Sequence, residues 1–132
     1  HAMTAHSFPI RVYYEDTDFS GNVYHAAYLK FFERGRTEFL RELGVHHAEL
    51  ARDGIAFAVR RMQIEFEAAA HIDDLLEVTT EVVAATGARL NLRQTISRDG
   101  VAIAVAEVQV VAIRTSGGAA RLPKVLLAAV RS

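Results

Sequence analysis

The chain contains 132 residues, of which 51% are hydrophobic and 23% are charged, and its formal net charge is −1. That length favours one domain with a proper core, and the balanced charge excludes a general electrostatic attraction to nucleic acid or to an anionic membrane. The sequence contains no cysteine, which excludes disulfides, thiolate nucleophiles and thiolate metal sites.

The first three residues indicate where the domain begins. His1-Ala2 looks like a remnant of an expression vector ahead of a natural start at Met3, so we expect one domain over residues 4–132. The start lacks the cationic and apolar regions of a secretory signal, and no segment approaches the roughly 20 consecutive apolar residues of a membrane helix. We therefore expect a cytoplasmic protein without a transmembrane segment.

The first predicted elements are a strand at Ile10–Tyr14 and a helix at Tyr24–Leu43. Pro9 suits the entrance of an edge strand, where its missing N–H is not needed. Apolar residues and one glycine recur at helical spacing and predict a buried helix face, formed by Tyr28, Phe31, Phe32, Gly35, Phe39, Leu40 and Leu43. A glycine inside a helix costs about 1 kcal/mol relative to alanine, so we expect another backbone to approach at Gly35. Gly44 is placed for a left-handed helix cap.

A short helix is predicted at Val45–Asp53, after which the apolar pattern changes to period two. Within Ile55–Phe66 the alternation changes phase at Arg60-Arg61. This phase change predicts a β-bulge, because only an extra residue would keep both halves of the strand facing the core.

Further alternating runs predict strands at Leu76–Ala84 and Leu90–Ile96. Asp99-Gly100 predicts a tight hairpin turn, since both central residues of such a turn need positive φ. The next strand, Val101–Arg114, begins with apolar residues on both faces, so we expect it to be central and covered on each side by the helix or by another subunit. A last helical turn is expected to open at Pro123 and run through Val130.

The order of these elements favours an α+β fold, in which a curved antiparallel sheet of about five strands wraps around one long central helix. This arrangement is the hot-dog fold. Its strand-to-helix junction, between Arg11 and Gly44, concentrates the polar residues that could support chemistry.

Two carboxylates, Asp16 and Asp18, lie in the turn that leads into the long helix, and Gly21 allows a tight bend there. The unpaired N–H groups of a helix start can receive a developing oxyanion, and a carboxylate beside them can act as a nucleophile or as a base for water. An Asx turn or a helix N-cap explains an aspartate at this place about equally well. We interpret Asp16 as the residue that shapes the turn.

The motif Tyr13-Tyr14-Glu15-Asp16-Thr17-Asp18, followed by Gly21, Val23-Tyr24-His25 and Tyr28, resembles the signature of a known family. It is similar to the hot-dog acyl-CoA thioesterases of the 4-hydroxybenzoyl-CoA thioesterase type, and most closely to their YbgC-like branch, which is associated with the Tol-Pal system. The stretch Phe66…Ile72-Asp73-Asp74 is a second point of resemblance. Together these motifs span roughly half of the chain.

The resemblance implies that Asp18 is the catalytic carboxylate, and that Tyr14 and His25 are polar residues beside it. It implies an acyl-CoA substrate and no cofactor. Val23, Tyr24 and Tyr28 would border the bound substrate, and helix-start amides from Val23 to His25 would receive the thioester oxygen. Without the resemblance, His25 is more often an ordinary first-turn helix residue, and the tyrosines are more often core aromatics.

Three positions depart from the family pattern. Ala69 stands where proline is frequent, Phe19 where a small residue is frequent, and Asn22 where an aliphatic residue is commoner. The first softens a turn. Because Phe19 and Asn22 border the expected site, they bear on substrate preference more than on the type of reaction.

Four arginines are candidates for binding the phosphates of CoA: Arg60, Arg61, Arg89 and Arg93. An ordinary solvated charged surface explains them equally well. His46, His47 and His71 lack metal-ligand spacing with other donors, so no metal site is expected. No nucleophile elbow or phosphate-binding glycine loop is present, which argues against α/β hydrolases and nucleotide hydrolases.

Three functions fit this sequence: a thioesterase, a hot-dog hydratase or dehydratase that acts on an acyl thioester, and a non-catalytic acyl-CoA-binding protein. The sequence leaves open the acyl group and whether the carrier is CoA or an acyl carrier protein. The apolar Val101–Arg114 strand and the single long helix leave more apolar surface than one small domain covers, so we expect a homodimer or homotetramer with the site between subunits.

Overall fold

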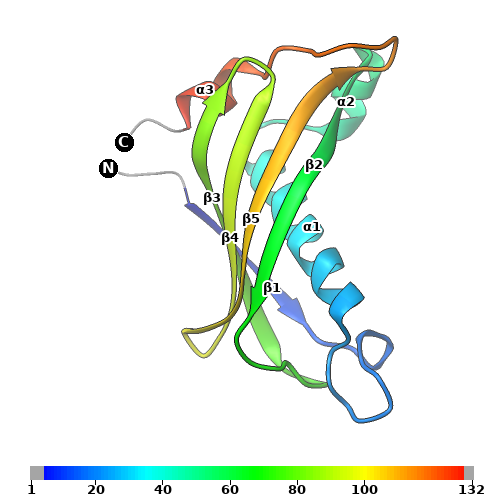
Figure 1. Ribbon diagram of the computed structural model, residues 1–132, viewed down its shortest axis with the longest axis vertical. Helices are drawn as coiled ribbons and strands as arrows, with labels where there is room; N and C mark the ends of the chain where they lie inside the picture. Colours follow the sequence, from blue (N-terminus) through cyan, green and yellow to red (C-terminus); the bar gives the residue numbers. More distant parts are fainter. Residues whose placement is uncertain (1–4, 130–132) are drawn as a thin grey trace.

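The computed structural model describes residues 5–129, which form one antiparallel sheet with a long helix along one face (Figure 1). The strands are β1 (Ala5–Arg11), β2 (Ile55–Phe66), β3 (Leu75–Thr86), β4 (Arg89–Arg98) and β5 (Val101–Arg114), in the order β1-β3-β4-β5-β2. The helices are α1 (His25–Glu42), α2 (His47–Arg52) and α3 (Lys124–Ala128). The predicted α+β fold, a curved five-stranded sheet around one long helix, is confirmed.

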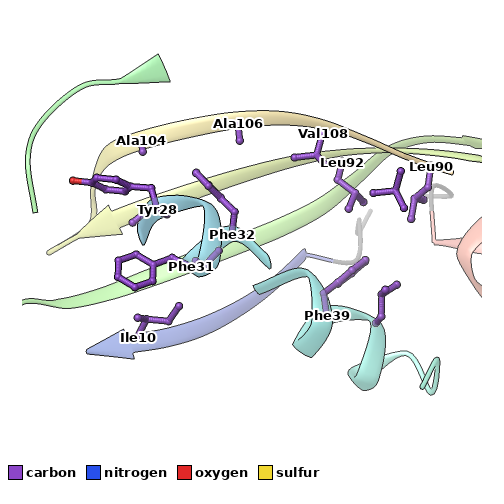
Figure 2. Close-up of a cluster of buried hydrophobic side chains, with 14 of the residues drawn as sticks. Ile10, Tyr28, Phe31, Phe32, Phe39, Leu90, Leu92, Ala104, Ala106 and Val108 are labelled. Atoms are coloured by element: carbon purple, nitrogen blue, oxygen red, sulfur yellow. The ribbon is translucent and has the colours of Figure 1, made fainter. Parts of the chain in front are cut away.

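Helix α1 supplies the centre of the core. Its aromatic side chains face the β4 and β5 residues Leu90, Leu92, Ala104, Ala106 and Val108 (Figure 2). Phe31, Phe32 and Phe39 are fully buried. The predicted ends of the helix are correct to within one residue. Gly44 has a φ of 83° and the N–H of Val45 donates to the carbonyl of Leu40 at 2.8 Å, so the predicted left-handed cap is present.

Helix α1 lies tightly against the sheet at Gly35. A Cβ on this residue would lie 2.5 Å from Val78 Cγ1 and 3.3 Å from Gln94 Nε2. A packing contact therefore explains the glycine. We expected a second backbone at this place, but the nearest neighbour is the Val78 side chain. Gln94 is fully buried, and its Nε2 donates to the Phe32 carbonyl and to Thr80 Oγ1, each at 2.9 Å.

The first strand lies earlier in the chain than predicted. β1 covers Ala5–Arg11, and Tyr14–Asp16 forms a 3-10 turn in place of the predicted end of the Ile10–Tyr14 strand. The buried Asp16 carboxylate causes this change, because its Oδ2 accepts the backbone N–H of Tyr13 at 2.8 Å and bends the chain. Pro9 lies within β1, which is an edge strand as predicted.

Two predicted irregularities of the sheet are present. The pairing of β2 with β5 changes register between Val59 and Arg61, which is the predicted bulge. The hairpin between β4 and β5 turns at Asp99 and Gly100, which have φ values of 53° and 79°.

Strand β5 is an interior strand, as predicted, although β4 takes the middle of the sheet. Its residues alternate between a buried face toward α1, which includes Ala106 and Val108, and an outer face on which Glu107 is exposed. Val105, Gln109 and Val111 on the outer face are partly exposed, so no element within residues 5–129 fully covers that part of the face. Helix α2 is shorter than the predicted Val45–Asp53, and α3 starts after Pro123, while the expected end at Val130 lies outside the described residues. No helix within residues 5–129 is long and apolar enough to cross a membrane.

We expect Gly35→Ala to destabilise the protein, even though alanine is the better helix former. The new methyl group would overlap Val78, and overpacking of this kind costs about 1–3 kcal/mol of unfolding free energy. Urea denaturation measures the loss. In a Val78→Ala background the same substitution should cost clearly less, and equal costs in the two backgrounds would contradict the proposed contact.

Candidate functional site

The turn between the 3-10 segment and α1 positions Asp18. The N–H of Asp18 donates to the Asn22 carbonyl at 2.8 Å, and the N–H of Gly21 donates to the Asp18 carbonyl at 3.1 Å. Gly21 has a φ of 86°, which a glycine adopts without strain. The turn is therefore closed by its own backbone, and the Asp18 side chain is left at the surface.

The Asp18 carboxylate is held by Ser20. Its Oδ1 accepts the Ser20 hydroxyl at 2.5 Å and the Ser20 backbone N–H at 2.8 Å. These hydrogen bonds lower the pKa of Asp18, because they stabilise the ionised form. The Asx turn considered from the sequence is thus present. Both Ser20 hydrogen bonds go to Oδ1, so Oδ2 is the oxygen of the carboxylate that can take part in chemistry.

The start of α1 provides fewer donors than the sequence suggested. The N–H of Val23 donates to the Ala70 carbonyl at 2.8 Å, and the N–H of Tyr24 donates to the Asp16 carbonyl at 3.3 Å. His25 and Ala26 are the first two residues of α1. The N–H groups at such positions have no hydrogen-bond partner within the helix. These two amides, and not those of Val23 and Tyr24, can receive an oxyanion.

A surface groove gathers five of the ten predicted site residues, namely Asp18, Val23, Tyr24, His25 and Tyr28. Its volume is about 410 Å³, and it is lined by Asp18, Asn22, Val23, Tyr24, His25, Tyr28, Phe66, Glu67, Ala68 and Ala69. We call this the Asp18 groove. The Phe66 ring packs against the rings of His25 and Tyr28, with centroids 4.8 Å and 5.2 Å apart. The end of β2 therefore forms one wall of the groove and the start of α1 forms another.

The loop after β2 is fixed by residues far from it in sequence. The hydroxyl of Tyr28 accepts the N–H of Ala70 at 2.9 Å, so this tyrosine positions the loop as well as lining the groove. Arg98 Nη1 donates to the Ala69 carbonyl at 2.9 Å and to Asp74 Oδ2 at 2.7 Å. Burial acts to raise the pKa of Asp74, but hydrogen bonds from the His71 N–H and from Arg98 hold it below the ordinary value.

The structure does not bring every predicted residue to the groove. Tyr14 is 79% exposed and does not line it. Arg60 donates to Gln109 Oε1 at 2.6 Å, and Arg93 pairs with Glu107 at 2.8 Å, which raises the Arg93 pKa.

Two more of the predicted arginines also lie away from the groove. Arg61 borders a different surface hollow. Arg89 pairs in register with Val111, seven residues along β5 from the Ala104 partner of Phe66, which is about 23 Å. Within one chain, the candidate phosphate-binding arginines and the Asp18 groove are separate.

Residues 5–129 contain no cluster of three or more histidine or acidic side chains that could hold a metal ion. Sequence reasoning missed Ser20, which lowers the pKa of Asp18, and Arg98, which holds the loop of the groove. Ser20 follows Asp18 at the spacing of an Asx turn, so the sequence did contain a signal for it.

Comparison with known proteins gives a consistent result. The model of the thioesterase-like superfamily matches residues 12–130. An acyl-CoA thioesterase YbgC of Haemophilus influenzae is 46% identical over 108 residues, which cover 81% of this chain and 79% of that protein. An acyl-CoA thioester hydrolase YbgC of Escherichia coli O6:H1 is 43% identical over 111 residues, which cover 83% of each. A solved probable thioesterase from Bartonella henselae has a TM-score of 0.86 at 44% identity and covers 91% of this chain and 100% of its own.

We expect Ser20→Ala to raise the pKa of Asp18 toward its ordinary value. The hydroxyl stabilises the ionised carboxylate, so its removal favours the protonated form, while the backbone N–H of residue 20 keeps part of the effect. Carboxyl titration by NMR measures this shift. Thr17→Ala is the matched control, because the Thr17 hydroxyl donates to the Tyr14 carbonyl and not to Asp18. An unchanged Asp18 pKa in Ser20→Ala would contradict the assignment.

Proposed function

This chain belongs to the thioesterase-like superfamily and hydrolyses acyl-CoA thioesters, and we propose that it does so in the Asp18 groove. The observation that carries the proposal is the placement of one ionised carboxylate and the start of α1 in a single hollow. A carboxylate can attack or activate water there, while helix-start amides receive the charge that develops on the thioester oxygen.

Asp18 can act in two ways. As a nucleophile, Oδ2 forms a bond to the thioester carbon, the carbon–sulfur bond breaks, CoA leaves as a thiolate, and water then hydrolyses the mixed anhydride. As a general base, Asp18 takes a proton from water while the water oxygen bonds to the same carbon, and the carbon–sulfur bond then breaks to release CoA, which takes up the proton, and the free acid. Both routes need the ionised carboxylate, which the Ser20 hydrogen bonds favour. A single turnover in heavy-oxygen water separates the two routes. Only the nucleophilic route passes through an anhydride on Asp18, so only this route can exchange an oxygen between the Asp18 carboxylate and the water or product.

The N–H groups of His25 and Ala26 are proposed to bind the carbonyl oxygen, and the His25 ring to orient or polarise the thioester. Phe66 supports that role, since its ring packs against His25 and limits the positions of the imidazole. Tyr24 and Tyr28 line the groove as substrate contacts. Tyr14 lies outside the groove within one chain, so a role for it in catalysis requires a contribution across subunits.

The same requirement applies to recognition of CoA. If Arg60, Arg61, Arg89 and Arg93 bind its phosphates, they do so for the groove of another subunit, because they lie away from the groove of their own. The proposal therefore includes assembly into a homodimer or homotetramer. We also propose that the protein acts in the cytoplasm. CoA is the proposed carrier, and acyl carrier protein conjugates are the alternative for the same site.

We expect the active protein to be an oligomer. β2 is an edge strand of 12 residues, and no strand lies beyond it among residues 5–129. A long free edge of this kind exposes unpaired N–H and C=O groups that a second copy can pair. Analytical ultracentrifugation across the concentrations used in the assay measures the assembly. A fully active monomer at those concentrations would refute this prediction.

We expect Asp18→Asn to lower the turnover number on the order of 100-fold or more while the fold persists. Asparagine keeps an oxygen that can accept the Ser20 hydrogen bonds, but it is neither an anionic nucleophile nor a useful base. Thiol release from a panel of acyl-CoAs measures the loss. The panel also separates hydrolysis from hydration, which leaves the thioester intact, and from binding without turnover.

Asp16→Asn is the matched control for this variant. The Asp16 carboxylate is buried and accepts the Tyr13 N–H, so its replacement should lower stability more than chemistry. Near-normal hydrolysis by Asp18→Asn together with its loss in Asp16→Asn would reverse our assignment of the two residues. Near-normal hydrolysis by both variants would place the catalytic centre outside this turn.

A further inference from the structure

Glu67 is a second carboxylate in the lining of the Asp18 groove, and the proposed reaction makes no use of it. It is the first residue after β2, it is exposed, and its N–H donates to the Ile103 carbonyl of β5 at 2.8 Å. The backbone of Glu67 is therefore tied to the sheet. None of the ion pairs within residues 5–129 includes its carboxylate, so the negative charge is left facing the groove.

The lining of the groove is acidic. It contains the carboxylates of Asp18 and Glu67, while no lysine or arginine of residues 5–129 lines it. Arg98 holds the same loop, but this arginine is already paired with Asp74 at 2.7 Å and donates to the Ala69 carbonyl. In Figure 1 the loop after β2 and the loop before α1 lie together at one end of the sheet, joined by the bridge between residues 22 and 71. Both carboxylates therefore act on one small space.

The part of the substrate that meets these charges is the acyl group. A thioester bound at Asp18 extends in two directions, as the acyl group and as the pantetheine arm of CoA. That arm is uncharged, and its whole length separates the thioester from the phosphates. A compact hollow of 410 Å³ is about 9 Å across, comparable with the Debye length of about 8 Å at physiological salt. Salt therefore screens Glu67 only partly from a charge on the acyl group.

We propose that Glu67 selects the acyl group by its charge. It disfavours acyl groups that end in a carboxylate, such as malonyl, and favours neutral or cationic acyl groups of the same length. This inference rests on the proposed function of the groove. Two unit charges about 7 Å apart near a protein surface change a binding constant about three- to tenfold. The neighbouring Phe66 ring strengthens the selection, because a carboxylate desolvated against it gains no hydrogen bond in return.

The test uses acyl-CoAs that have equal chain length and different charge. Malonyl-CoA carries an anionic acyl group, butyryl-CoA a neutral one and β-alanyl-CoA a cationic one. The measured quantity is kcat/KM for each, and for an acyl group that binds without turnover it is the inhibition constant. Glu67→Gln removes the charge and keeps the size of the side chain. Glu65→Gln is the matched control, because Glu65 is also exposed, two residues earlier on β2, but does not line the groove.

We expect Glu67→Gln to raise the ratio of kcat/KM for malonyl-CoA to that for butyryl-CoA about three- to tenfold. The ratio of β-alanyl-CoA to butyryl-CoA should fall by a similar factor. The opposite signs separate charge from shape, since the glutamine has the same shape for every substrate. Both shifts should become smaller at about 1 M salt, where the Debye length is about 3 Å. Glu65→Gln should keep both ratios of the unmodified enzyme.

Unchanged ratios in Glu67→Gln would overturn the inference. Shifts of the same sign for malonyl-CoA and β-alanyl-CoA would also overturn it, and so would equal shifts in Glu65→Gln. Absence of hydrolysis of every acyl-CoA by the unmodified protein would instead refute the proposed function. The two failures are therefore distinguishable in one set of measurements.

Discussion

The candidate site depends on the hydrogen bonds that join the segment before α1 to the loop after β2. The N–H of Val23 donates to the Ala70 carbonyl, the N–H of Ile72 to the Gly21 carbonyl, and the N–H of Val12 to the Asp74 carbonyl. The Tyr28 hydroxyl and Arg98 add side-chain bonds to the same loop. These contacts satisfy backbone groups that a loop of alanines could not satisfy by itself. Without them the carboxylate, the helix start and Phe66 would not face one hollow.

The parts of the structure that the sequence predicted are those set by neighbouring residues. The turn at Asp99-Gly100, the cap at Gly44 and the buried face of α1 each follow from local backbone preference or from helical period. The bulge near Arg60 was predictable because the alternation itself changes phase. Asp18 was recognisable as a candidate because its turn and the helix after it are contiguous in the sequence.

The remaining features depend on pairing between distant segments. Nothing near Arg98 indicates that it holds Ala69 and Asp74, which lie more than twenty residues earlier. The misplaced end of β1 has a similar origin, because Tyr13 and Tyr14 are good strand residues and only the burial of Asp16 makes the chain bend. The amides of Val23 and Tyr24 were expected to be free, but the Ala70 and Asp16 carbonyls occupy them.

The buried Gln94 has a consequence for the position of the candidate site. A purely apolar helix face tolerates sliding by one turn, whereas the bonds from Gln94 to the Phe32 carbonyl and to Thr80 hold in only one seating of α1 on the sheet. The start of α1 belongs to the same helix as Phe32, so this seating also fixes where His25 and Ala26 lie relative to the sheet. A polar contact in the core, far along the chain from Asp18, therefore holds the helix end that faces this carboxylate in register.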